Sequence, residues 1–182
     1  MSLEVDERYA VRDAVKSNNP LIKVALGALG VVCSELGPLR LEDLYHKALH
    51  KALLTDFKGV EVTSEQKVPV IYDKEEIGNG RTDLQLKQGV HQLVIELKGG
   101  RSTAATAKLD VYQLIHYLND LKQDTGLLAY CGTPNQSVVD VFMVVRVGSV
   151  PLELNVKMDK ASWAVIRIKQ ELTTKPEHVF YS

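Results

Sequence analysis

The hydrophobic pattern in the first third of the chain predicts helices. Apolar residues from Leu41 to Phe57 recur every three or four positions, which is typical of an amphipathic helix. The stretch Leu21–Leu36 is apolar almost throughout and ends at Gly37-Pro38, so it predicts a largely buried helix. A further helix is expected over Glu4–Ser17, before the helix-breaking Asn19-Pro20.

From Val60 onward the pattern alternates with a period of two, which predicts strands. One bent strand or two short ones are expected between Val60 and Tyr72, then a turn over Ile77–Gly80, and later a helix over Ala107–Lys122. The remaining strands are expected at Thr82–Lys87, His91–Lys98, Thr125–Cys131, Val138–Val147 and Trp163–Ile168. This order of helices, strands, one helix and further strands predicts an α+β domain with a mixed sheet.

The runs Thr82–Lys87 and His91–Lys98 are expected to pair as a hairpin. A turn at Gly89-Val90 suits type II′ geometry, which favours glycine at the first position. This register keeps the aliphatic side chains of both strands on one face, which supports it. A turn at Gln88-Gly89 would keep the same faces. With the first turn, the opposed pairs are Gln88 with His91, Leu86 with Leu93, and Leu84 with Ile95.

The same hairpin brings two carboxylates together. Asp83 is expected opposite Glu96, with Cβ atoms ~5 Å apart, or diagonal to it with the alternative turn. Lys98 lies two residues further on and shares that face. Because facing carboxylates repel each other, a hard cation such as Mg²⁺ suits them, and water activated by such a cation hydrolyses phosphodiesters. The competing interpretation is a solvated ladder of charges on a strand, which is the more common meaning of such a pattern.

Composition narrows the class of protein. The 182 residues include 45% hydrophobic and 25% charged residues, as in a single globular domain, and this excludes disordered, collagen-like and coiled-coil proteins. Lys and Arg number 22 against 23 Asp and Glu, so the net charge of −1 excludes a globally basic nucleic-acid binder. No secretory signal or membrane span is evident, and Cys33 and Cys131 predict buried thiols. A soluble intracellular protein of the cytoplasm or nucleus is therefore expected.

Further motifs lie before and after the hairpin along the chain. The stretch Leu36–Tyr45 carries Glu42 and Tyr45, and Gln113–Leu118 follows the hairpin. Within the hairpin, Asp83 is followed after twelve residues by Glu96-Leu97-Lys98. Together these motifs resemble the PD-(D/E)XK nuclease superfamily and, within it, the GxxExxY group. Thr82 stands where the family has proline, and Leu39 where the group has its glycine. The resemblance also includes Gln66, Val68–Tyr72, Arg81 and Thr125–Leu128.

The resemblance implies a restriction-endonuclease-like core over residues 21–131, with a helical extension at 1–20 and a β-rich extension at 132–182. It also implies a nuclease that uses Mg²⁺ or Mn²⁺ to cleave DNA or RNA. By position, Asp83 and Glu96 would bind the metal with the backbone carbonyl of Leu97. Glu42 would approach the metal from the first core helix. Lys98 would orient the attacking water and stabilise charge that develops on the phosphate.

Residues beyond the metal ligands are implied to support the site. Gln113 and Tyr117 are i, i+4 neighbours on one helix and would support the site or contact phosphate, although Tyr117 suits plain packing equally well. Nucleic-acid affinity comes mainly from neutralised phosphates, so this near-neutral chain is expected to bind weakly or with a partner's help. The nearest cations are Arg101 and Lys108, which bound a Gly/Ser/Thr/Ala-rich loop, and Lys47 and Lys51 on the helix of Glu42.

The rival interpretation is a catalytically inactive protein that keeps the fold and acts as a scaffold, through self-association or a partner. The neutral charge and Leu39 favour it. The run Val138–Val147 is apolar enough to form an intersubunit strand or face, so a homodimer suits either interpretation. His46 and His50 have a spacing that can hold zinc, but without a neighbouring glutamate they are interpreted as part of a solvated helix face.

Overall fold

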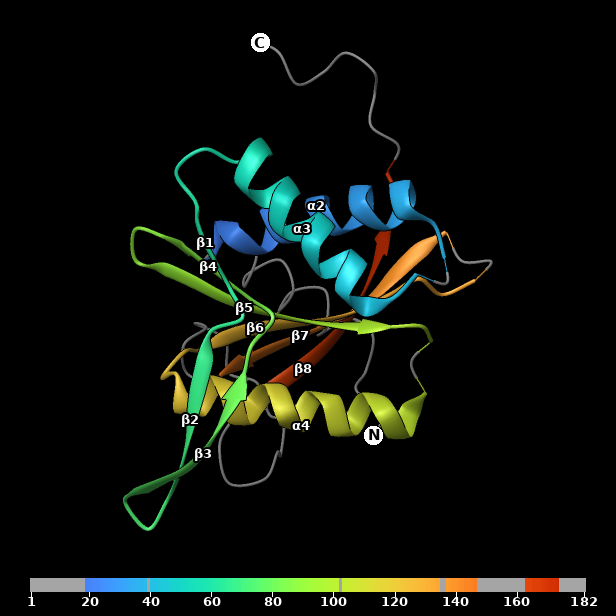
Figure 1. Ribbon diagram of the computed structural model, residues 1–182. Coiled ribbons are helices and arrows are strands. Elements are labelled where there is room, and N and C mark those ends of the chain that lie inside the picture. Colours follow the sequence, from blue (N-terminus) through green and yellow to red (C-terminus); the bar gives the residue numbers. More distant parts are fainter. Residues whose placement is uncertain (1–18, 39, 102, 135–136, 147–162, 174–182) are drawn as a thin grey trace.

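The computed structural model describes residues 19–38, 40–101, 103–134, 137–146 and 163–173 (Figure 1). The helix expected over Glu4–Ser17 lies outside the described residues, as does Leu39. The described helices are α2 (Pro20–Leu36), α3 (Glu42–Asp56) and α4 (Ala104–Asp120). The strands are β1 (Glu61–Ser64), β2 (Lys67–Tyr72), β3 (Glu75–Arg81), β4 (Leu84–Gln88), β5 (His91–Gly99), β6 (Thr125–Cys131), β7 (Val138–Arg146) and β8 (Trp163–Glu171).

Six strands form one mixed sheet in the order β1-β4-β5-β6-β7-β8, and β2 and β3 form a separate hairpin. Within the large sheet β5 and β6 are parallel, while the other neighbouring strands run antiparallel. The parallel pair needs a crossover connection, and α4 supplies it. The predicted α+β class with a mixed sheet is confirmed.

The sheet separates two hydrophobic layers. Helices α2 and α3 cover one face, and α4 covers the other (Figure 1). The layer under α2 and α3 is the larger, and it includes Leu93, Ile95 and Leu97 from β5. Val94 of the same strand belongs to the smaller layer under α4. Strand β5 therefore contributes to both cores.

Side-chain caps fix where two of the helices begin. The Asn19 side chain accepts a hydrogen bond from the Leu21 amide, with Pro20 as the first helical residue. Thr103 and Thr106 form a reciprocal capping box at the start of α4. Because this cap starts α4 at Ala104, the prediction of a loop running to Lys108 is wrong.

The β4–β5 hairpin has the predicted register. Gln88 pairs with His91, and the aliphatic pairs expected on the buried face are also present. Gly89 has a φ of 58°, whereas Val90 is not among the described residues with positive φ, as a type II′ turn requires. The turn at Gly89-Val90 is thus confirmed.

The β2–β3 hairpin corrects one prediction. The segment Ile77–Gly80 lies inside β3, and the turn is formed instead by Asp73 and Lys74, whose φ angles are 47° and 69°. Such paired positive φ angles are typical of tight hairpin turns. Of the two alternatives left open for residues Val60–Tyr72, the two short strands are observed. The hairpin extends away from the rest of the molecule (Figure 1).

Strand β7 corrects a second prediction. It pairs with β6 on one side and with β8 on the other, and most of its side chains are buried. A strand with both edges paired has no free hydrogen-bonding groups for another subunit, so the proposed role of Val138–Val147 as an intersubunit strand is wrong. The alternative of an intersubunit face in this region, and with it the homodimer, stays a prediction.

The two cysteines lie next to each other in the core. Cys33 and Cys131 are both buried and free, with their sulfur atoms 3.1 Å apart, so the prediction of buried thiols is confirmed.

Within the described part of the chain, no helix has the length and apolar character to cross a membrane.

Candidate active site

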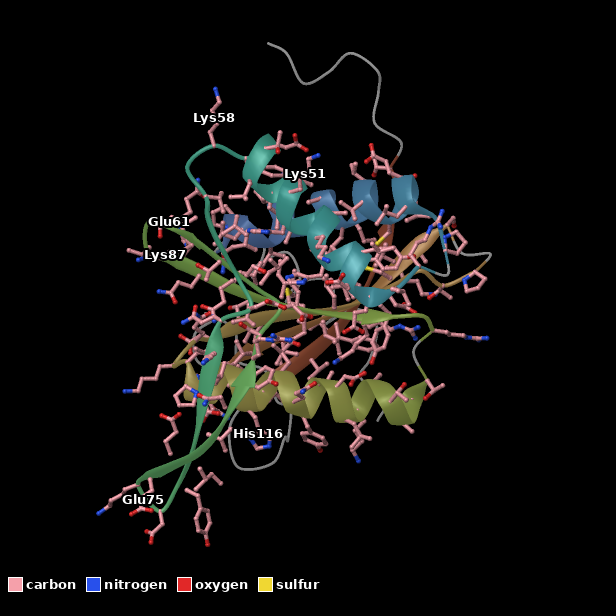
Figure 2. The ribbon with its side chains drawn as sticks, viewed as in Figure 1. Lys51, Lys58, Glu61, Glu75, Lys87 and His116 are labelled. Carbon is pink, nitrogen blue, oxygen red and sulfur yellow. The ribbon has the colours of Figure 1, made fainter. Side chains whose placement is uncertain are left out.

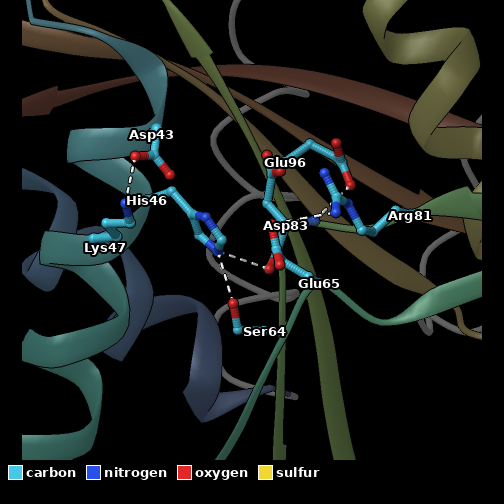
Figure 3. A network of polar contacts seen from close by, with 8 residues as sticks. All are labelled: Asp43, His46, Lys47, Ser64, Glu65, Arg81, Asp83 and Glu96. Carbon is cyan, nitrogen blue, oxygen red and sulfur yellow. Dashed lines mark hydrogen bonds and ion pairs between the residues drawn. The ribbon is translucent and has the colours of Figure 1, made fainter.

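Asp83 and Glu96 meet at the point where the chain enters β4. The β4–β5 ladder begins at the pair of Leu84 with Ile95, and Asp83, directly before it, lies beside Glu96. The Asp83 amide donates to Glu96 Oε1 at 3.2 Å (Figure 3). The Leu97 amide donates to Asp83 Oδ2 at 2.7 Å. Each carboxylate thus bonds the backbone of the opposite strand, and the two acids lie together as the sequence predicts.

Glu96 is the more buried of the two acids, with 4% of its surface exposed. It sits on the α4 face of β5, between buried Val94 and half-exposed Lys98. Burial first, and then the negative charge of Asp83, raises the pKa of Glu96 to about 8. The pair therefore does not carry two full negative charges at neutral pH without a cation beside it.

Lys98 and two residues of α4 continue the site on the same face. The Lys98 ammonium donates to Gln113 Oε1 at 3.4 Å, and Gln113 Nε2 donates to Tyr117 Oη at 3.2 Å. The Tyr117 ring packs against Gly80 of β3, where an added Cβ would lie 2.6 Å from the ring. Gly80 thus permits a close approach of Tyr117, which ties the β2–β3 hairpin to α4.

Glu42 reaches the site from the first turn of α3. Its Oε2 accepts a hydrogen bond from the Gly99 amide at 3.0 Å, at the end of β5. The α3 N-cap residue, Leu41, makes no side-chain cap, so the acids Glu42 and Asp43 are the groups that complement the positive end of the helix dipole. Glu42 therefore lies next to the strand end that carries Lys98, while its carboxylate bonds the backbone.

Tyr45, the other signature residue of this helix, has a packing role in the structure. Its hydroxyl donates to the Gly37 carbonyl at 2.6 Å and accepts from the Arg40 amide at 3.3 Å. A Cβ at Gly132, whose φ is 81°, would lie 2.4 Å from the same hydroxyl. Tyr45 thus fixes the connection between α2 and α3, just before Glu42.

His46 is a residue of the site whose role the sequence analysis missed. It is 9% exposed, and the prediction of a solvated helix face is wrong for it, whereas His50 is half-buried. His46 Nε2 lies 3.0 Å from the Asp83 carbonyl oxygen and 3.1 Å from Ser64 Oγ (Figure 3). A signal was present, because His46 shares the i, i+3, i+7 stripe with buried Leu49 and Leu53.

The cations expected to contact nucleic acid are exposed in the structure. Lys47 is exposed and forms an ion pair with Asp43 at 2.6 Å, and this hydrogen bond raises the pKa of Lys47. Arg101 is exposed, and Lys108 lies over the Tyr112 ring, 6.0 Å from its centre. Lys51 lies on the outer part of α3 (Figure 2).

The donor set fits a hard divalent cation. Asp83, Glu96 and Glu42 offer oxygen atoms only, and Mg²⁺ commonly takes one or two carboxylates together with water and phosphate oxygens. Among the described residues, no group of three or more His, Cys, Asp or Glu side chains is arranged to hold a metal ion. The structure brings two carboxylates together, with Asp83 beside a largely buried Glu96.

The mixed sheet between helices, with Asp83 just before β4 and Glu96 and Lys98 on β5, is consistent with a restriction-endonuclease-like fold. The chain belongs to the PD-(D/E)XK nuclease superfamily, because the model of that family matches residues 19–140. No curated protein matches it. One solved structure, described as "Crystal structure of SSO0001", is similar at 20% identity with a TM-score of 0.40. The alignment covers 72% of this chain and 50% of the other protein, so this chain spans about half the length of that protein.

Proposed function

We propose that this chain is a nuclease that uses Mg²⁺ or Mn²⁺ to hydrolyse phosphodiester bonds of DNA or RNA. The observation that carries the proposal is the grouping of Asp83, just before β4, with Glu96 and Lys98 of the neighbouring β5 in a PD-(D/E)XK fold. Members of this superfamily are generally nucleases that use divalent metals. The placement of Glu42 and Gln113 beside the same strand end gives further support.

In this proposal Asp83, Glu96 and the backbone carbonyl of Leu97 would hold the cation, with Glu42 close by. A bound divalent cation would supply Lewis-acid polarisation of the phosphate and a lower pKa for a nearby water. Lys98 orients the water and donates hydrogen bonds to the charge that develops on the phosphate. Gln113 accepts a hydrogen bond from the Lys98 ammonium and so directs it.

The substrate is held weakly or with the help of a partner. The chain has a net charge of −1, and two cations near the site, Lys47 and Arg81, are paired with Asp43 and Glu65. Since phosphate neutralisation provides most nucleic-acid affinity, few charges remain to supply it. Arg101 and Lys108 are the proposed contacts.

A cleavage assay on the purified chain tests the proposal. Single- and double-stranded DNA and RNA are incubated with Mg²⁺, with Mn²⁺, or with chelator, using wild type, Asp83→Ala and Glu96→Ala. Glu75→Ala, a change of an exposed acid at the tip of the β2–β3 hairpin (Figure 2), is the matched control. The proposal expects metal-dependent cleavage by wild type and the control only. Cleavage that persists in both site variants, or cleavage of no substrate, contradicts it.

The second candidate function is a catalytically inactive binding or scaffold protein with the same fold. The paired cations at Lys47 and Arg81 favour it, because they leave little positive charge for substrate. Such a protein has no need of a divalent cation. Binding of nucleic acid or a protein partner without cleavage, and without an effect of Mg²⁺, is the result that would support this candidate.

A further inference from the structure

We infer that His46 is a positioning residue that fixes the backbone of Asp83 and thereby the place of its carboxylate. This inference rests on the proposed function, in which the Asp83 carboxylate binds the cation. His46 belongs to α3, and Asp83 lies 37 positions further along the chain, just before β4. The contact between them therefore joins a helix to the strand segment that carries the first acid.

The geometry of the contact determines which nitrogen carries the proton. His46 Nε2 lies 3.0 Å from the Asp83 carbonyl oxygen. Because a carbonyl oxygen only accepts hydrogen bonds, Nε2 must be the protonated nitrogen and the donor. Ser64 Oγ, 3.1 Å from the same nitrogen, then shares this N–H as a second acceptor. His46 thus acts on Asp83 through a directed N–H group, and Figure 3 shows the ring pointing toward both acceptors.

Asp83 needs such support because it lies outside the paired part of β4. The ladder between β4 and β5 begins at Leu84, and that between β1 and β4 ends at the pair of Ser64 with Leu84. The Asp83 carbonyl accepts one further bond, from the amide of Glu65 at 2.9 Å. Glu65 itself has a φ of 55°, so the β1 backbone turns away at this point. The imidazole therefore supplies a second donor where the ladder has stopped.

His46 and Glu42 act from the same side of the site. They are one turn apart on α3, and Glu42 accepts the Gly99 amide at the end of β5. The helix thus bonds the backbone at Asp83 and the backbone just beyond Lys98. Partners that orient metal ligands in this way typically change metal affinity by about 10- to 100-fold when they are removed.

Packing alone does not require a histidine at this position. His46 lies in the buried stripe of α3 with Leu49 and Leu53, where a leucine would fill similar space. What the imidazole adds is one N–H donor, which a glutamine places at a comparable distance from the backbone. Leucine and glutamine substitutions therefore separate the packing role from the donor role.

The test compares His46→Leu, His46→Gln and the control His50→Leu in two measurements. The first is Mn²⁺ affinity by calorimetry, expected to fall about 10-fold in His46→Leu and to be restored by His46→Gln. The second is hydrogen exchange of the Leu97 amide in metal-free protein. This amide donates to Asp83 Oδ2, so it reports the place of the carboxylate directly. Its exchange is expected to accelerate roughly 5- to 10-fold in His46→Leu, and in neither other variant.

The two measurements separate failure of the inference from failure of the proposed function. If wild type binds no Mn²⁺ but the Leu97 amide responds as expected, the proposed function fails while the positioning role stands. If His46→Leu leaves the Leu97 amide unchanged, the inference is overturned. It is also overturned if His46→Gln fails as fully as His46→Leu, because packing then explains the effect.

Discussion

The two faces of strand β5 differ in a way that explains where the site lies. On the α2/α3 face, Leu93, Ile95 and Leu97 are fully buried along the whole strand. On the α4 face the sequence runs from buried Val94 through buried Glu96 to half-exposed Lys98. The same strand is therefore held rigidly by one core and presents charge at the margin of the other.

This difference shows how a fold can keep an acid in an unfavourable setting. Burying a carboxylate beside another carboxylate costs free energy, and the pKa of Glu96 rises to about 8 as a result. The large core on the opposite face compensates, because Ile95 and Leu97 flank Glu96 and are wholly buried. We expect substitutions on the two faces to separate stability from activity, and the predictions below test that separation.

The largest effect is expected on the α2/α3 face. Ile95→Ala removes a fully buried side chain and should lower the free energy of unfolding by about 2–5 kcal/mol. Urea denaturation measures this change. The folded variant should keep the metal affinity of wild type, because Ile95 faces away from the site. Ile77→Ala, at an exposed position on the β2–β3 hairpin, should change stability by less than about 0.5 kcal/mol. Equal effects of the two changes would refute the comparison.

The next effect is expected on the α4 face and on activity alone. Lys98→Met removes the charge proposed to stabilise the phosphate, and single-turnover cleavage should slow about 10²- to 10³-fold. Thermal stability should change little, because Lys98 is half-exposed and bonds Gln113 at the long distance of 3.4 Å. Lys87→Met, at an exposed position on β4, is the matched control (Figure 2). A rate close to that of wild type would remove Lys98 from the mechanism.

A third prediction concerns the pH dependence of stability without metal. The folded pKa of Glu96, about 8, lies above its usual 4.5, so the folded state retains a proton that the unfolded state has lost. The free energy of unfolding therefore falls as pH rises, by about 2–3 kcal/mol between about pH 5.5 and about pH 7.5. Glu96→Gln should lack this decrease in urea denaturation across the same range. If the two proteins show the same profile, Glu96 is not the titrating group.

The smallest effect is expected for charges at the rim of the site. Arg101→Ala should weaken nucleic-acid binding less than about 10-fold and reduce the slope of affinity against salt by about 1. Fluorescence anisotropy at several salt concentrations measures both quantities. Lys58→Ala, beyond the end of α3 (Figure 2), should leave the slope unchanged. An equal change in both variants would mean that binding is diffuse and does not involve the site.

The hairpin that carries the site could be predicted from the sequence because its determinants are local. Alternating Leu84 and Leu86 opposite Leu93 and Ile95, with Gly89 at the turn, specify the register, and the register brings the acids together. The fold class followed from the order of helical and alternating patterns, and the family resemblance agrees with the match over residues 19–140.

Other features depended on contacts that a single sequence does not reveal. His46 bonds the backbone carbonyl oxygen of Asp83. Because every residue has such an oxygen, the amino acid at position 83 could not indicate this contact. The Ile77–Gly80 segment has the composition of a turn, yet Gly80 serves to admit the Tyr117 ring from α4. Lys47 pairs with Asp43, one helical turn away, and its contact with nucleic acid stays a prediction. Each of these contacts involves a neighbour or partner that the hydrophobic pattern does not include.

Calorimetric titration with Mn²⁺ tests the central claim most directly. The account predicts saturable binding to wild type that is lost in Asp83→Asn and in Glu96→Gln, and retained in Glu75→Gln at the hairpin tip. Because the pKa of Glu96 is about 8, binding at neutral pH should also release a proton, so the measured heat should vary with the ionisation enthalpy of the buffer. Absence of binding by wild type, or binding that both site variants retain, would contradict the account.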